Sequence, residues 1–266
     1  MLPRPQGIFF SKVARAARVM AIAFPFCTIL YPSSVRAAES ESYIVARQNI
    51  PLVRRNELVT KLRKITGWAD LDFDRAGGLH SGNRAAVGGS KTAREFLMSA
   101  MRGPAVVVLE DASRSADIAF CRVNAGRWTK DPEAGPAAYV VQIDFSDFEQ
   151  VTGDERALEA FNVGWGLLHE LDHAVNDSSD ASVLEEAGEC EAHINQMRRE
   201  CNLPERANYY FSPVPFAADP VFITRLVRLG FEQQQASTNK KKRYWLVWDA
   251  NAVGGLTEQK QIASLR

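Results

Sequence analysis

An HExxH run at residues 169–173 constrains this chain more than any other feature. On a helix, residues four apart lie on one face, so the imidazoles of His169 and His173 converge on one point outside the backbone. Glu170 lies about 100° further round the helix, close enough to reach a water held at that point. Two neutral nitrogen ligands, an open position and a carboxylate are what a hydrolytic zinc site requires. The run therefore predicts a helix that carries a metal site.

The histidines of the chain are concentrated around this run. Only four occur in 266 residues, and three of them, His169, His173 and His193, fall within 25 residues. The structural alternative is a helix whose two histidines bond to neighbouring backbone groups. The clustering favours the metal site, because such a helix has no need of a further imidazole nearby.

The helix predicted around the run has two different faces. A capping box at 152–155 marks its expected start, and the side away from the histidines is apolar. The histidine side is polar and contains Gly166, and the same helix also holds Gly164. Each glycine costs roughly 1 kcal/mol relative to alanine in a helix interior. A buried helix with such a notched polar face is typical of a cleft floor.

The remaining patterns predict an α+β fold, in which a small mixed sheet packs against this helix and a second helix. Strands are expected at 105–109, 118–123, 139–145 and 244–248. Helices are expected around 58–65, from a capping box at 92–95, at about 183–201, and within 221–229. A basic run at 240–243 is interpreted as a solvated hairpin tip.

The first 37 residues have the composition of a secretory signal peptide. Four basic residues precede a short apolar core at 19–30, and Val35-Arg36-Ala37 places small side chains at a cleavage site. The apolar run is too short for a comfortable membrane span. We therefore expect an exported bacterial protein, periplasmic or secreted, with no stable membrane span after cleavage.

Removal of this leader changes the charge of the chain. The leader holds five of the 32 basic residues and none of the 32 acidic ones, so the mature chain carries a net charge of −5. Such a balance argues against nucleic acid or an anionic membrane as the partner. Residues 38–266 are expected to form a single domain, with an N-terminal lobe at about 38–150 and the HExxH and C-terminal helical part at about 151–266.

Three cysteines remain in the mature chain. Cys190 and Cys201 cannot bridge within one straight helix, because 11 residues rise about 16 Å. A bridge from Cys121 to either of them is possible but has no support, and a buried reduced thiol is expected for one of the helical pair.

A third metal ligand is expected on the helix at about 183–201. A reversing turn after the first helix would carry the early turns of the second past the metal. Glu189 and Glu191, 16 and 18 residues beyond His173, both satisfy this requirement. His193 as a direct ligand is a further alternative.

The pattern Glu189-Cys-Glu-Ala-His193 resembles the second motif of zincin metallopeptidases of the glutamate-ligand branch, the gluzincins, with histidine in place of the usual aspartate. Residues 161–210 are also similar to bacterial secreted, effector-type metallopeptidases. The resemblance implies a zincin-like fold in which Glu189 is the third ligand and His193 supports a ligand histidine. Glu191 stays as the alternative ligand, because Glu191 and Asn195 fit a looser form of the motif.

The resemblance also implies a mechanism. His169, His173 and Glu189 would hold Zn²⁺, and Glu170 would take a proton from the zinc-bound water that attacks an amide carbonyl. Tyr209 or Tyr210, or else His80, would stabilise the oxyanion. The strand at 139–145 would pair with an extended substrate.

These expectations combine into an exported zinc-dependent metallopeptidase that acts on peptide or protein substrates. One alternative is a zinc amidase on non-peptide substrates, and another is a secreted binding module that zinc only stabilises. The carboxylate of Glu170 argues against the binding module, because a structural zinc site has no use for it between the two histidines.

Overall fold

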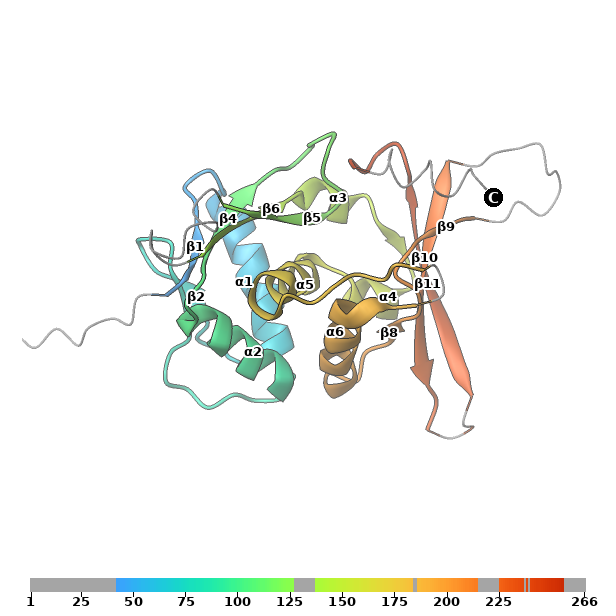
Figure 1. Cartoon of the computed structure of the whole chain (residues 1–266). Helices are drawn as coiled ribbons and strands as arrows, with labels where there is room; N and C mark the ends of the chain where they lie inside the picture. The colour runs from blue at the N-terminus through green and yellow to red at the C-terminus, as the bar shows by residue number, and fades with distance from the viewer. Residues whose placement is uncertain are drawn as a thin grey trace, which may run out of the picture. The chain divides into compact units, whose positions relative to one another are not determined.

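The computed structural model describes residues 42–126, 137–183, 186–214, 225–236, 238 and 240–255 (Figure 1). All of them belong to one compact unit, Ser40–Arg266. The expected leader at 1–37 lies outside the described residues. Helices and small sheets alternate along the unit, which makes the fold α+β, as predicted.

The first sheet has four strands in the order β1 (Ile44–Ala46), β4 (Val106–Asp111), β6 (Ala138–Ile143) and β5 (Cys121–Ala125). The first three are parallel, and β5 runs antiparallel to β6. Val107 and Leu109 are fully buried while their neighbours are less so, which is the two-residue period of a strand. The strands expected at 105–109, 118–123 and 139–145 are confirmed with shifted ends.

Two helices pack with this sheet. Helix α1 (Leu52–Thr66) ends at Gly67, whose φ of 74° is the left-handed conformation that glycine adopts readily. Helix α2 (Lys91–Arg102) begins after Ser90, whose hydroxyl accepts a hydrogen bond from the amide of Ala93. The predicted cap was Thr92, but the Thr92 amide and hydroxyl both donate to Glu200 instead.

The motif helix is shorter than predicted. A short helix α3 (Phe145–Glu149), a strand β7 (Thr152–Gly153) and a helix α4 (Glu155–Ala160) precede it. Helix α5 (Val163–Asn176) is a separate helix with its own N-cap, because the side chain of Asn162 accepts a hydrogen bond from the amide of Gly164. The capping box expected at 152–155 therefore does not open the motif helix: Thr152 lies in β7, and Asp154 precedes α4 without a side-chain capping hydrogen bond.

The second sheet occupies the C-terminal part, which is not only helical. After α6 (Gly188–Glu200) come β8 (Glu205–Arg206), β9 (Ser212–Pro213), β10 (Leu226–Gln234) and β11 (Lys241–Asp249). The sheet order is β7-β11-β10-β8, and β9 also pairs with β10. Strands β2 (Asp72–Phe73) and β3 (Leu79–His80) form a separate two-stranded hairpin.

The helix expected within 221–229 is wrong where the structure describes it, because residues 226–229 belong to β10. Val227, Leu229 and Phe231 are buried at two-residue spacing, which suits a strand better than a helix. Residues 221–224 lie outside the described residues. The strand expected at 244–248 is confirmed and begins earlier, at Lys241. Residues 241–243 of the basic run are exposed, as expected, but they pair with β10 and belong to the strand, so the hairpin tip lies before them.

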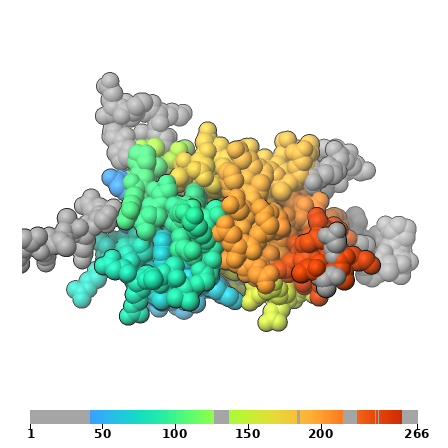
Figure 2. All heavy atoms as spheres, turned by 90° about the horizontal axis from the view of Figure 1, so that it is seen from below, coloured from blue at the N-terminus to red at the C-terminus, as the bar shows by residue number. Residues whose placement is uncertain are grey.

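Two hydrophobic clusters form the interior. One joins the first sheet to α1, α2, α5 and α6, and the other joins α4 to the second sheet. In the space-filling view the surface of α2 adjoins that of α6 (Figure 2), where Glu200 accepts hydrogen bonds from Ser90 and Thr92. All three cysteines of the described part are free. Among the described residues, none of the helices combines the length and apolar character needed for a membrane span.

Candidate metal centre

His169 and His173 lie one turn apart on α5 and direct their Nε2 atoms at one another, 3.2 Å apart. This is the convergence expected from the HExxH spacing. The hydrogen bond on the far side of each ring decides whether its Nε2 atom carries a proton or a lone pair.

Each imidazole is held from behind by an acceptor. His173 Nδ1 lies 2.7 Å from the carbonyl oxygen of Ser178, which can only accept, so Nδ1 carries the proton. His169 Nδ1 lies 3.4 Å from a carboxylate oxygen of Glu191, which fixes the same tautomer. In the neutral rings, both Nε2 atoms therefore present lone pairs to the same point. Two such lone pairs need a cation or a proton between them.

A carboxylate joins the two nitrogens from the turn after α5. Asp180 Oδ1 lies 3.2 Å from His169 Nε2 and 3.4 Å from His173 Nε2. Ligand atoms about 2.0–2.1 Å from a tetrahedral zinc ion lie roughly 3.3–3.4 Å from each other. The triangle of two nitrogens and one oxygen therefore has the dimensions of one face of a zinc coordination sphere.

The local backbone explains why Asp180 reaches this point. Asp177 ends α5 with a φ of 55°, a left-handed residue that turns the chain back toward the helix. Residue Asp180 then pairs with Gly188 at the start of α6. Gly188 has a φ of 82°, and a Cβ there would lie 2.3 Å from the amide nitrogen of Ala181. The turn that carries Asp180, residues 177–181, thus contacts the backbone of α6 directly.

The charge balance of this group favours a cation. Burial raises the pKa of Asp180, but hydrogen bonds from His169 and His173 outweigh it and hold this pKa well below its usual range. Burial lowers the pKa of His169, yet its bonds with Asp180, Cys190 and Glu191 raise it above the ordinary value. A metal ion would compete with protons for the same negative site, so its binding should release protons.

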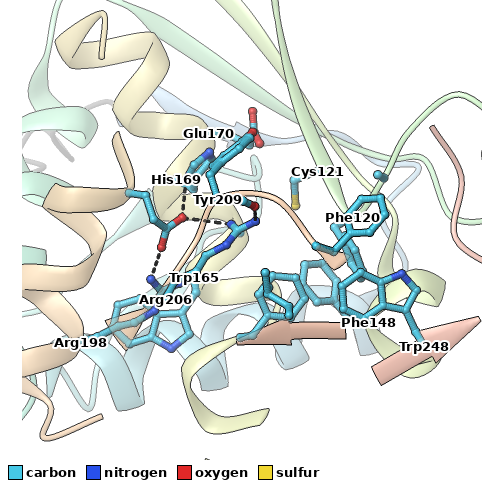
Figure 3. Close-up of a pocket in the computed structure, with 16 residues that line it drawn as sticks. Phe120, Cys121, Phe148, Trp165, His169, Glu170, Arg198, Arg206, Tyr209 and Trp248 are labelled. Carbon is cyan, nitrogen blue, oxygen red and sulfur yellow. Dashed lines mark hydrogen bonds and ion pairs between the residues drawn. The ribbon is translucent and has the colours of Figure 1, made fainter. Parts of the chain in front are cut away.

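Glu191 lies beneath the centre and not in it. Its side chain is 1 % exposed, one oxygen contacts Arg198, and the other lies 3.1 Å from Arg206 Nη1 and 3.4 Å from His169 Nδ1 (Figure 3). Burial raises the pKa of Glu191, but the two arginines lower it much further. This carboxylate is thus ionised and orients His169 from behind.

The other residues expected on the second helix lie elsewhere. Glu189 is outside the group of converging ligand atoms, and its carboxylate accepts a hydrogen bond of 3.4 Å from the amide of Ser179. His193 Nδ1 lies 2.9 Å from Asp172 Oδ2 and 3.5 Å from the hydroxyl of Ser178. Because α6 begins only at Gly188, the turn before it brings a carboxylate to the two Nε2 atoms, while the first turn of α6 packs behind His169.

Both tyrosines fasten the ligand turn. The Tyr209 hydroxyl donates to Asp180 Oδ2 at 2.6 Å, and its ring stacks on that of His169 with centroids 6.1 Å apart. Tyr210 donates to the carbonyl of Ala181 at 2.8 Å. Burial raises the pKa of Tyr209 strongly, so its hydroxyl remains a donor. His80, on β3, bonds only within its own hairpin, to the carbonyl of Gly78.

Glu170 faces the edge of the first sheet. Its Oε2 accepts a 2.7 Å hydrogen bond from the amide of Val123 on β5. Burial raises the pKa of Glu170, while the neighbouring His169 and His173 lower it. Strand β6, the one expected to hold substrate, lies between β4 and β5, so β5 is the strand whose outer edge faces the motif helix.

Cys190 completes the group that the described residues bring together. One ligand atom each from His169, His173, Asp180 and Cys190 lies within 4.8 Å of the others. The thiol, however, is 3.2 Å from Nδ1 of His169, on the far side of the ring from Nε2. Burial raises the pKa of Cys190 to about 11, which keeps it a thiol. It packs behind the ligand and does not face the ion position.

Sequence reasoning did not identify Asp180. Asp180 lies seven residues after His173 in a short polar turn, whereas the third ligand was predicted among the carboxylates of the following helix. Comparisons with protein-family models, with curated proteins and with solved structures found no match for this chain.

Proposed function

We propose that this chain is an exported zinc-dependent metallopeptidase with a zincin-like arrangement, and that His169, His173 and Asp180 hold the metal. The proposal rests on one observation: the Nε2 lone pairs of both imidazoles and a carboxylate oxygen of Asp180 point at the same position. The lone pairs are available there because the hydrogen bonds behind the rings place the protons on Nδ1. Two histidines and one carboxylate are a donor set that catalytic zinc ions use, with the fourth position open. Asp180 takes the place of Glu189 or Glu191 in this proposal.

The zincin-like arrangement is supported by what surrounds the motif helix. Helix α5 packs against β5 and β6, and the antiparallel strand β5 lies at the edge of the sheet beside Glu170. Apart from the Val123 amide, which donates to Glu170, the outer edge of β5 would offer its backbone groups to an extended peptide. The mature chain's negative charge favours a peptide over a nucleic acid.

The residues of the chain have distinct parts in hydrolysis. A bound zinc ion would supply a water of lowered pKa and would polarise the scissile carbonyl. Glu170, next to His169 and with its pKa raised by burial, accepts the proton of the attacking water and returns it to the leaving nitrogen. Val123 fixes the orientation of this carboxylate. Tyr209 positions Asp180, because its hydroxyl donates to the carboxylate of that residue.

The decisive experiment compares two carboxylates of the same region. Zinc content is measured in the purified full chain, in Asp180→Ala and in Glu189→Ala. We expect one zinc per chain in the wild type and in Glu189→Ala, and loss of zinc in Asp180→Ala. Zinc lost only from Glu189→Ala would refute the proposed ligand set.

Catalysis is tested separately with Glu170→Gln on a peptide library. We expect zinc to be retained and cleavage to fall by several orders of magnitude. Zinc in every variant together with no cleavage by the wild type would identify a zinc-stabilised binding module instead.

A further inference from the structure

A pocket opens beside Glu170, between the motif helix and the second sheet (Figure 3). Its volume is about 120 Å³. One wall is formed by Gly166, His169 and Glu170 of α5, together with Cys121 at the start of β5. The facing wall consists of aromatic side chains from five separate segments, namely Phe120, Phe148, Phe161, Phe211 and Trp248.

The aromatic wall is built around Phe120. Its ring centroid lies 5.2 Å from that of Phe148, 5.0 Å from Phe161 and 5.5 Å from Trp248. The backbone of Phe120 has a φ of 63°, which is strained for a bulky residue. The carboxylate of Asp147 accepts a 2.9 Å hydrogen bond from the Phe120 amide and so maintains this conformation. The wall is thus pre-formed and does not depend on a ligand.

The charged groups at the pocket's inner end are already paired. Arg206 donates to Glu191 and to the carbonyls of Asn208 and Tyr209. Arg198 donates to Glu191, to Asn195 and to the carbonyl of Ala160. A charged ligand group would lose its hydration here, and these paired arginines and Glu191 offer it no free charge in exchange, which is unfavourable. The pocket therefore suits an uncharged, apolar group.

The volume sets an upper size for that group. An apolar cavity of about 150 Å³ in another protein binds one benzene molecule. A pocket of about 120 Å³ thus has room for a phenyl or a branched aliphatic side chain, and not for an indole.

Gly166 keeps this pocket open next to the metal centre. A Cβ added at Gly166 would lie 2.9 Å from the Sγ of Cys121 and 3.0 Å from Cζ of Phe148, both lining atoms of the pocket. Gly164, two residues earlier, is equally crowded but on another side. Its Cβ would lie 2.9 Å from Cβ of Lys61 and 3.0 Å from Cδ1 of Ile65, on α1. The two glycines form a matched pair for experiment.

We propose that this aromatic pocket is the specificity site of the enzyme and accepts one uncharged apolar side chain, leucine, methionine or phenylalanine, from the residue next to the cleaved bond. The proposal rests on the proposed peptidase function. It adds the substrate class and a size limit, because His169, a proposed metal ligand, and Glu170, the proposed base, both line the pocket.

The test uses the full chain in three forms, wild type, Gly166→Ala and Gly164→Ala. Cleavage of a peptide library gives the preference at each position around the cut. Binding of benzene and of indole, followed by NMR, reports on the pocket without any need for catalysis. Phe148→Leu, which enlarges the pocket, is the second variant should Gly166→Ala not fold.

We expect the wild type to prefer leucine, methionine and phenylalanine over alanine or charged residues by about 10-fold or more at one position. Gly166→Ala should shift that preference toward smaller residues and abolish benzene binding, while Gly164→Ala leaves both unchanged. Phe148→Leu should admit tryptophan and indole.

Two results overturn the proposal while the peptidase function stands. One is cleavage without an apolar preference, and the other is a profile that changes equally in both glycine variants. If no form cleaves any peptide, the peptidase proposal fails, and the benzene result alone decides the pocket. Binding that Gly166→Ala abolishes then supports the ligand class, and no binding to the wild type overturns it.

Discussion

Replacing Tyr209 by phenylalanine should weaken zinc binding without changing any ligand. The hydroxyl of Tyr209 donates a 2.6 Å hydrogen bond to Oδ2 of Asp180, the oxygen that does not face the histidines. The ring stays in place, because it stacks on His169 and lies under the guanidinium of Arg206 at 4.9 Å. The substitution therefore removes only the donor that holds the ligand carboxylate.

The size of the effect follows from the charge of the acceptor. A hydrogen bond to a charged group contributes about 1.5–3 kcal/mol, and loss of an outer partner of a metal ligand typically costs about 10- to 100-fold in affinity. We expect Tyr209→Phe to raise the zinc dissociation constant within this range. Competition with a fluorescent chelator at fixed pH measures it directly.

Tyr210→Phe is the matched control. Its hydroxyl donates to the neutral carbonyl of Ala181, one residue beyond Asp180, at 2.8 Å. Loss of this bond should cost about 0.5–1.5 kcal/mol in folding stability and leave zinc affinity nearly unchanged. Equal losses of affinity in both variants, or none in Tyr209→Phe, would show that Asp180 is not the ligand that the hydroxyl orients.

Three other predictions concern the buried charges and the metal. Glu191→Gln leaves Arg198 and Arg206 without their buried counter-charge, so urea unfolding should show a loss of about 3–5 kcal/mol, and an unchanged midpoint would contradict the ion-pair role. Burial raises the pKa of Asp147 from 3.8 to about 7, against the lowering effect of its backbone bonds to Phe120 and Gly254, with the neighbouring Asp144 raising it further. The folded state therefore binds the proton more tightly, and stability should fall as pH rises from about 4 to about 7, by about 1–2 kcal/mol after solvent screening. In Asp147→Asn this slope should flatten, and a slope equal to that of the wild type would rule out Asp147 as its source. Chelation of zinc should lower the melting temperature by about 5–10 °C, and added zinc should restore it; a melting temperature indifferent to chelator would mean that no metal stabilises the fold.

The local parts of this fold were predictable from sequence because short-range rules decide them. The HExxH spacing on an apolar stretch sufficed for α5 and its paired imidazoles, and a glycine after an apolar helix pattern marked the end of α1. Three strands of the first sheet, β4, β5 and β6, followed from short apolar runs, whereas β1 was not predicted. The helix predicted at 221–229 was wrong because a short apolar run fits both the helical and the two-residue strand period. Only the pairing of β10 with β11 decides between them.

The third ligand and the pocket could not be predicted in the same way. Asp180 reaches the metal position only because Asp177 turns left-handed and Gly188 receives the returning chain, and neither event has a spacing rule. The resemblance to the gluzincins predicted a ligand on α6, but there Glu191 is buried beside two arginines and Glu189 contacts the turn. The aromatic wall combines α3, β11 and three loop residues, and their meeting is a property of the whole fold.

The fit of Gly188 against the amide of Ala181 has a consequence for how this protein tolerates change. Any larger residue there would displace the loop that bears Asp180, so the proposed activity would be lost although every residue assigned to the reaction was intact. A survey of inactivating substitutions should consequently find a hot spot at a position that never meets metal, water or peptide.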